Sequence, residues 1–291
     1  MNEYALATLL GVVEGLTEFL PVSSTAHLRI CEALLGVDLG DAYWKTFSIV
    51  IQLGAILCLP IYFRDRLVAF ARTFPRGSRG DRTALTHPFS LTLLAFAVTA
   101  IPAFLLARVI GEHLESLSIM AAALIVGGVV MAAVDLAYER SRHRAFARGG
   151  LTEDVEQMTV AQAVWIGACQ VLAAVFPGTS RSMATITAGE LAGMSRPAAL
   201  EFSFLISIPT MAAATIYDLL RSLRPAAGRG SAIGAMANDA HAWTLLAIGF
   251  VVSFIVAYGV VAWFMSWVRS RGFLPFAVYR IVAGAAVLWW A

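Results

Sequence analysis

Long apolar runs, separated by short polar stretches, dominate this chain of 291 residues. A membrane-spanning helix needs about 20 consecutive apolar residues. Runs close to that length occur near 44–63, 89–108, 118–138, 199–220, 243–264 and 273–290, so about six crossings are expected. Two further apolar segments, 4–36 and 159–193, are broken near their middle by proline and hydroxyl residues. These interrupted segments favour re-entrant helical hairpins over complete spans, because the break needs polar neighbours or a cavity.

The two interrupted segments also align with each other. An offset of 156 residues pairs Gly11 with Gly167, Glu14 with Gln170, Pro21 with Pro177, and Ser24 with Ser180. Each half of the chain then holds one hairpin and three spans, and an odd number of spans inverts the second copy in the membrane. The predicted fold class is therefore all-α: a polytopic membrane helix bundle of about six transmembrane helices plus two re-entrant hairpins. It forms a single membrane domain over 1–291, with inverted repeats of about 1–150 and 151–291.

Composition excludes an ordinary soluble domain. Hydrophobic residues make up 59% of the chain and charged residues only 14%, whereas soluble domains carry about 25% charged residues. The net charge of +2 indicates no nucleic-acid surface. The chain is thus expected to be a multi-pass membrane protein whose neighbours are lipids.

Arginines in the loops predict how the chain is oriented. If each hairpin returns to its own side, one face carries the loops 64–87, 139–158 and 265–272, which hold six, four and two arginines. The loop 221–241 on the opposite face holds three. Because arginine-rich loops stay in the cytoplasm, both termini are predicted to lie outside.

Two acids lie inside the first hairpin. Glu14 and Glu18 are four residues apart, so in a helix both project from the same face. Two such carboxylates can hold a divalent cation or share a proton. The alternative is that a nearby arginine neutralises the pair.

Hydroxyl residues follow the break in each hairpin. They are suited to cap the helix that comes next, and the first backbone N–H groups of such a helix can bind phosphate. Two helix N-termini converging on one point would therefore favour an anionic ligand. The candidates are Ser23, Ser24 and Thr25 in the first hairpin and Ser180 in the second.

Further polar residues could complete a site. Arg181 begins the second such helix, where its planar fork could clamp phosphoryl oxygens or pair with one of the acids. His27 is the only histidine in a segment predicted to be embedded, and it could serve as base, acid or nucleophile, or be a satisfied core residue. Ser182 and Thr185 could bind substrate oxygens or only their own backbone. Gln52 and Arg280 are further polar residues within predicted spans.

These motifs resemble a known family. Glu14-x-x-x-Glu18 followed by Pro-Val-Ser-Ser-Thr-Ala-His27, and Pro177-Gly-x-Ser-Arg-Ser-x-x-Thr185, look like the two signature regions of the bacterial undecaprenyl-diphosphate phosphatase family, also called bacitracin resistance proteins. The resemblance implies an enzyme of the bacterial cytoplasmic (inner) membrane. Its active site is expected to open to the outer face. Such an enzyme removes the terminal phosphate of undecaprenyl diphosphate and so recycles the lipid carrier for cell-wall synthesis.

The resemblance also implies roles for individual residues. The family's acidic pair falls on Glu14 and Glu18, its histidine on His27, and its phosphate-binding serine and arginine on Ser180 and Arg181, with Ser24 and Thr185 alongside. Together with the residue chemistry above, this predicts catalysis by Glu18, Ser24, His27 and Arg181, and substrate binding by Ser23, Thr25, Ser180, Ser182 and Thr185. Glu14 and Glu18 would hold the divalent cation, Mg²⁺ or Ca²⁺, that the family requires. Ala26 and Met183 depart from the glycine and the small residue that are common in the family, which puts substrate fit rather than activity in doubt.

Three points stay open from the sequence. The attacking group could be Ser24 activated by His27, His27 itself, or a water activated by Glu18. The same architecture would also suit a secondary transporter or lipid flippase, because inverted repeats with broken helices are typical of transporters. A homodimer and a monomer are both compatible with the chain.

Overall fold

The computed structural model describes residues 2–38, 40–106, 116–146, 150–222 and 239–290, with side chains left aside at 141–146 and 221–222. Within these residues the chain forms helices and no β-strand. The helices are α1 (Glu3–Thr17), α2 (Ser24–Leu34), α3 (Ala42–Tyr62), α4 (Arg64–Thr73), α5 (Pro88–Leu105), α7 (Leu117–Phe146), the 3₁₀ turn η1 (Val155–Gln157), α8 (Val160–Val175), α9 (Arg181–Leu191), α10 (Arg196–Ser222), α12 (Ala240–Trp267) and α13 (Leu274–Trp290).

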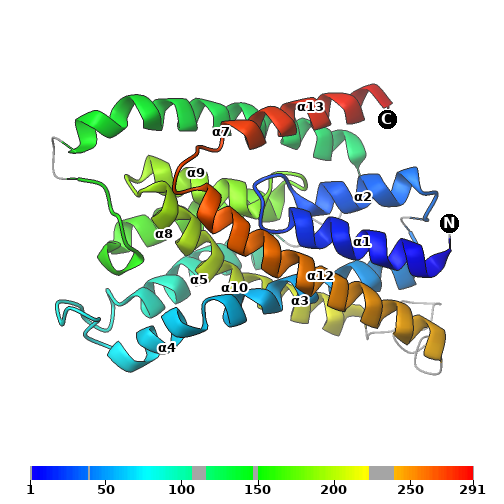
Figure 1. The fold of residues 1–291 in the computed structure, drawn as a ribbon, viewed down its shortest axis with the longest axis horizontal. Helices are drawn as coiled ribbons and strands as arrows, with labels where there is room; N and C mark the ends of the chain where they lie inside the picture. The colour runs from blue at the N-terminus through cyan, green and yellow to red at the C-terminus, as the bar shows by residue number, and fades with distance from the viewer. Residues whose placement is uncertain (1, 39, 107–115, 147–149, 223–238, 291) are drawn as a thin grey trace.

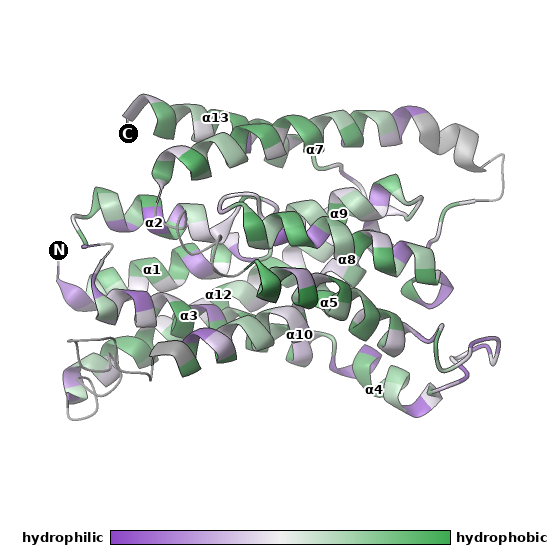
Figure 2. Cartoon of the chain, turned by 180° about the vertical axis from the view of Figure 1, so that it is seen from behind, coloured by the Kyte–Doolittle hydropathy of each residue, from purple (hydrophilic) through white to green (hydrophobic). Residues whose placement is uncertain are grey.

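Five of these helices are long and apolar enough to cross a membrane: α3, α5, α7, α10 and α12. The sixth predicted crossing corresponds to α13, an apolar helix of 17 residues. Hydrophobic residues make up most of the helices, and hydrophilic residues are concentrated toward the two ends of the bundle, with a few near its middle (Figure 2). Side chains such as Ile101, Val126, Ile255 and Val282 are more than 60% exposed, which water would disfavour and lipid would not. The expected polytopic helix bundle is confirmed.

Both interrupted segments are broken into pairs of short helices. Helices α1 and α2 fill the half of the molecule next to the termini, and α8 and α9 fill the other half (Figure 1). With 15 and 16 residues, α1 and α8 span about 24 Å at most at about 1.5 Å per residue, less than the hydrocarbon core of a bilayer. Neither pair therefore crosses the bundle completely, and the two breaks meet inside it, where Ser182 donates a hydrogen bond to the carbonyl oxygen of Leu20.

The two breaks share an uncommon backbone conformation. Ser23 and Ser180 are the N-cap residues of α2 and α9, and their φ angles are +75° and +70°. A positive φ is costly for a residue with a side chain and is found mostly at functional sites. The sequence offset of 156 pairs Ser24 with Ser180, whereas the caps pair Ser23 with Ser180, because the second break is one residue longer after its proline.

Two glycines that align in the sequence make the same kind of contact. A Cβ at Gly11 would lie 2.7 Å from the carbonyl oxygen of Gly249 in α12, and a Cβ at Gly167 would lie 2.5 Å from that of Ala95 in α5. Glycine at these positions lets each hairpin approach the backbone of its neighbouring helix. The inverted repeat itself stays a prediction from the sequence.

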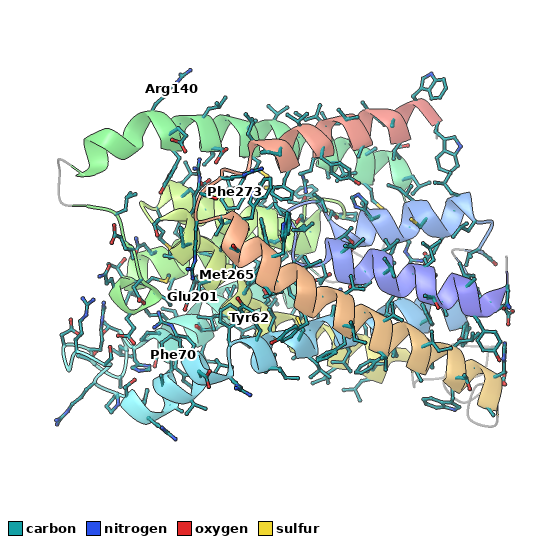
Figure 3. All side chains as sticks on the ribbon, viewed as in Figure 1. Tyr62, Phe70, Arg140, Glu201, Met265 and Phe273 are labelled. Carbon is teal, nitrogen blue, oxygen red and sulfur yellow. The ribbon has the colours of Figure 1, made fainter. Side chains whose placement is uncertain are left out.

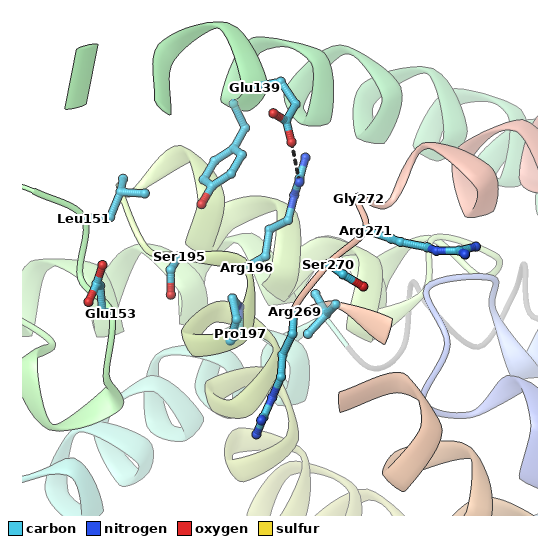
Figure 4. A pocket seen from close by; sticks show the side chains of 12 residues that line it. Glu139, Leu151, Glu153, Ser195, Arg196, Pro197, Arg269, Ser270, Arg271 and Gly272 are labelled. Carbon is cyan, nitrogen blue, oxygen red and sulfur yellow. Dashed lines mark hydrogen bonds and ion pairs between the residues drawn. The ribbon is translucent and has the colours of Figure 1, made fainter. Parts of the chain in front are cut away.

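The termini lie at one end of the bundle, and α4 with the loop that follows it lies at the other (Figure 1). Near the α4 end, Arg196 joins three helices. Its guanidinium contacts Asp135 at 2.6 Å and Glu139 at 2.5 Å, both in α7, and Glu190 of α9 at 3.2 Å. Asp135 also accepts hydrogen bonds from the backbone N–H groups of Phe273 and Leu274, where α13 begins. Figure 4 shows this arginine beside a cavity of about 270 Å³.

Arg196 is expected to stabilise the bundle without taking part in chemistry. Arg196→Met would leave the buried carboxylates of Asp135 and Glu190 without a counter-charge, so it should lower the free energy of unfolding by about 3 to 5 kcal/mol. Thermal unfolding in detergent measures this loss. Arg140→Met is the matched control, because Arg140 projects away from the bundle (Figure 3). Equal unfolding temperatures for the two variants would contradict the stabilising role.

Candidate active site

The breaks of the two hairpins are joined by charged side chains. Nη2 of Arg181, in the first turn of α9, lies 3.1 Å from Oε1 of Glu18, at the end of α1. Ser24, in the first turn of α2, donates a hydrogen bond of 2.5 Å from its Oγ to the other carboxylate oxygen, Oε2. One carboxylate thus connects a serine on its own hairpin with an arginine on the opposite one.

A cavity of about 220 Å³ opens beside this cluster. Both hairpins contribute to its wall, together with α3, α5 and α10. The predicted site residues that line it are Glu18, Ser23, Ser24, Thr25, Ser180 and Arg181. Glu14, His27, Ser182 and Thr185 are not among its lining residues.

Glu14 lies in α1, four residues before Glu18, and is fully buried. No donor among the described residues reaches either of its carboxylate oxygens, while the charges of Glu18 and Arg181 act on it. A buried carboxylate without a partner is costly, so this group needs a proton or a cation. Two neighbouring carboxylates also match the one or two protein ligands by which Mg²⁺ is commonly held beside phosphates. The described residues hold no group of three or more His, Cys, Asp or Glu that could bind a metal alone.

His27 is engaged away from the serine. Its Nδ1 lies 2.7 Å from the carbonyl oxygen of Ser23, which can only accept, so Nδ1 carries the proton. Its Nε2 lies 2.6 Å from the hydroxyl of Tyr279, and the two rings stack 5.6 Å apart. The pairing of Ser24 with His27 considered from the sequence is therefore not the contact that the structure has; Ser24 pairs with Glu18.

The hydroxyls of Ser182 and Thr185 bond to the protein itself. Oγ of Ser182 donates to the carbonyl oxygen of Leu20 in the opposite break at 2.8 Å. Oγ1 of Thr185 lies 3.0 Å from the carbonyl oxygen of Arg181 and 2.6 Å from the hydroxyl of Ser203. Ser180 accepts from the backbone N–H of Met183 as an N-cap and also faces the cavity.

Several polar residues at the site were not predicted from the sequence. Thr99, Gln170 and Thr210 line the cavity with Gln52, and Nε2 of Gln170 donates to the hydroxyls of both threonines. The alignment of Gln170 with Glu14 was the signal that could have placed it there. Tyr279 had a signal too, since it precedes Arg280 within an apolar helix.

The site can accept an anion. The first backbone N–H groups of α2 and α9 point toward the middle of the bundle, where partial positive charge favours phosphate. Nε of Arg181 is buried and has no hydrogen-bond partner among the described residues. A phosphoryl group entering the cavity would meet backbone N–H donors and the guanidinium of Arg181. It would also meet Ser24, which is hydrogen-bonded to the carboxylate of Glu18.

Comparison with known proteins gives consistent results. The family described as "Bacitracin resistance protein BacA" matches residues 7–286. The chain is 67% identical to an undecaprenyl-diphosphatase of Koribacter versatilis, covering 100% of this chain and 99% of the relative. It is 43% identical to that of Sorangium cellulosum, covering 97% and 85%, and 40% identical to that of Thermus thermophilus, covering 96% and 94%.

The anion site predicts stabilisation by inorganic diphosphate. At about one hundred times its Kd, a ligand that binds only the folded protein adds about 2.7 kcal/mol to its stability, which raises the unfolding temperature in detergent. Arg181→Met should lose this rise, because it removes the guanidinium that faces the cavity. Arg196→Met should keep the rise above its own lower baseline. A rise that persists in Arg181→Met would place the anion elsewhere.

Proposed function

Because this chain belongs to the family of bacitracin resistance proteins, we propose that it is an integral membrane phosphatase for undecaprenyl diphosphate, with its active site at the meeting hairpin breaks. The reaction releases the terminal phosphate and leaves undecaprenyl phosphate, the lipid carrier that cell-wall synthesis uses again. The observation that carries this assignment of the site is the contact of Glu18 with both Ser24 and Arg181.

Charge neutralisation is the first requirement of the reaction. The terminal phosphoryl group is an anion whose oxygens keep their charge while the anhydride bond breaks, so fixed positive groups lower the barrier. Arg181 supplies a guanidinium whose Nε–H has no acceptor among the described residues, and the N-termini of α2 and α9 supply backbone donors. Ser23, Thr25 and Ser180 would orient the diphosphate from the cavity wall.

Ser24 is the best-placed attacking group. Its Oγ would form a bond to the terminal phosphorus as the anhydride oxygen leaves with undecaprenyl phosphate, and its proton would pass to Glu18, 2.5 Å away. Water would then hydrolyse the phosphoserine. A water activated by Glu18 in one step is the alternative, whereas His27 has both ring nitrogens engaged with Ser23 and Tyr279.

A divalent cation, Mg²⁺ or Ca²⁺, fits the two neighbouring carboxylates. Glu14 and Glu18 would hold it, and neither carboxylate oxygen of Glu14 has a hydrogen-bond partner among the described residues. When bound, the cation would offset charge on the phosphoryl oxygens. Without it, the buried carboxyl group of Glu14 would stay without a partner among the described residues.

The proposal extends to location. The chain would lie in the bacterial inner membrane with both termini outside and the arginine-rich loops in the cytoplasm. Figure 1 supports this arrangement, since the termini share one end of the bundle and α4 marks the other. The active site would open to the outer face. A homodimer stays a prediction.

Glu18→Gln and Arg181→Met should each reduce kcat/KM by about 10²-fold or more, because each removes a charge needed in the transition state. The assay is phosphate release from undecaprenyl diphosphate by monodisperse protein in detergent, with Arg140→Met as the control. Full turnover in either variant would show that the active site lies elsewhere. Wild-type protein that moves the lipid across liposomes without releasing phosphate would instead support the transporter alternative.

Removal of divalent cations tests the carboxylate pair. A chelator should abolish phosphate release by the wild-type protein, and added Mg²⁺ or Ca²⁺ should restore it. Glu14→Gln should require a cation concentration about tenfold or more higher, because it removes one of two charged ligands. Turnover that is insensitive to the chelator, or an unchanged cation requirement in Glu14→Gln, would contradict this part of the proposal.

A further inference from the structure

Arg280 is a buried cation that the proposed reaction does not use. Arg280 lies in the middle of α13 and is 0% exposed, the largest fully buried side chain among the described residues. Among the described residues, no carboxylate forms an ion pair with its guanidinium. Arginine is rarely buried without a counter-charge, so its hydrogen bonds must serve a particular purpose.

Within the described residues, every hydrogen bond of this guanidinium goes to a backbone carbonyl oxygen, and its Nε has no partner. Nη1 donates to Pro21 in the first break at 3.1 Å. Nη2 lies 3.1 Å from the oxygen of Gly178 and 2.9 Å from that of Thr179, both in the second break, and 3.1 Å from that of Ala123 in α7. One side chain therefore contacts both hairpin breaks at once.

The geometry of the breaks explains why arginine is needed. Where a helix is interrupted, the carbonyl groups lose the N–H partner they would have had one turn later, and in an apolar interior they need another donor. The planar guanidinium carries donors on separate nitrogens, so it can reach two breaks in fixed directions. The single nitrogen of lysine cannot span them in the same way.

The neighbouring helix leaves room for this arrangement. A Cβ at Gly127 in α7 would overlap Nη2 of Arg280 and lie 2.8 Å from the methyl carbon of Met183. Glycine at 127 thus permits the guanidinium to sit between α7 and the two breaks. Any larger residue would have to push the arginine away from its carbonyl partners.

We propose that Arg280 is a positioning residue that holds the two hairpin breaks together, and so sets Glu18 and Ser24 against Arg181. It is not among the residues that line the cavity, so it acts on the substrate only through the two hairpin breaks. Among the described residues, one other hydrogen bond joins the two breaks through a backbone carbonyl, that from Ser182 to Leu20. The catalytic part of this inference rests on the proposed function.

The first experiment separates kcat from KM in Arg280→Met and Arg280→Lys. A displacement of about 1 Å at a reacting centre can cost about 10²-fold in rate. Arg280→Met should therefore lose about 10²-fold in kcat per folded molecule, with KM changed less than about threefold, and Arg280→Lys should lie between it and the wild type. Arg196→Met removes a different buried arginine, whose ion pairs are with Asp135, Glu139 and Glu190. This variant should keep its kcat per folded molecule. Unchanged kcat in Arg280→Met, or an equal loss in Arg196→Met, would overturn the proposal.

A second variant guards against failure to fold. Gly127→Ala changes neither Arg280 nor the residues of the cavity wall, but its added Cβ would displace the guanidinium of Arg280. It should therefore also lower kcat by about tenfold or more without raising KM. Full kcat in Gly127→Ala with normal stability would count against the proposal.

A distance measurement tests the contact without any turnover. Spin labels at Leu16 and Phe176, which are 44% and 51% exposed near the ends of α1 and α8, would be attached in a chain whose three cysteines are replaced. The distance distribution should be narrow with Arg280 present and broader or shifted in Arg280→Lys. Identical distributions would refute the contact. If the wild type released no phosphate while its distance distribution still differed from that of Arg280→Lys, the proposed function would be refuted and the contact of Arg280 with the two breaks would be supported.

Discussion

The ion pair between Glu18 and Arg181 is the interaction on which the rest of this structure depends. It joins two helix breaks that are far apart in the sequence, and it buries both charges in the middle of an apolar bundle. An unpaired charge at that depth would be very costly, so each hairpin needs the other to remain folded as it is. The same pair places a serine, a carboxylate and a guanidinium around one cavity. Stability and chemistry thus share the same residues here.

Two polar clusters in this bundle differ in a way that separates structure from function. At the α4 end, Arg196 is surrounded by three carboxylates, and Asp135 also caps the start of α13. At the hairpin breaks, by contrast, the oxygens of Glu14 and Nε of Arg181 have no partner among the described residues. An unsatisfied buried group has a specific cause, such as a catalytic role or an ion or water that meets it. The cluster around Arg196 therefore stabilises the fold, whereas the cluster at the hairpin breaks has polar groups available for a substrate.

The sequence was informative about residue types and poor at contacts. Hydropathy located the five long helices, and the prolines at 21 and 177 located both breaks, since these signals are local. The residue types also brought Glu18, Ser24 and Arg181 into one candidate site, because charges in apolar segments are rarely accidental. The partner of His27 could not be predicted, since Tyr279 lies 252 residues away and only tertiary packing brings them together. For the same reason, Arg280 was noticed as a polar residue in a predicted span without any indication that it contacts both breaks.

A double-mutant cycle on Glu18 and Arg181 tests the central claim most directly, because it measures whether the two hairpins act as one site. The kcat/KM for phosphate release would be measured for the wild type, Glu18→Gln, Arg181→Met and the double variant. Residues that act as a unit give strongly non-additive losses. The account predicts that the double variant is hardly worse than either single variant. Losses that multiply fully in the double variant would show that the two side chains act independently and would contradict a single site built from both breaks.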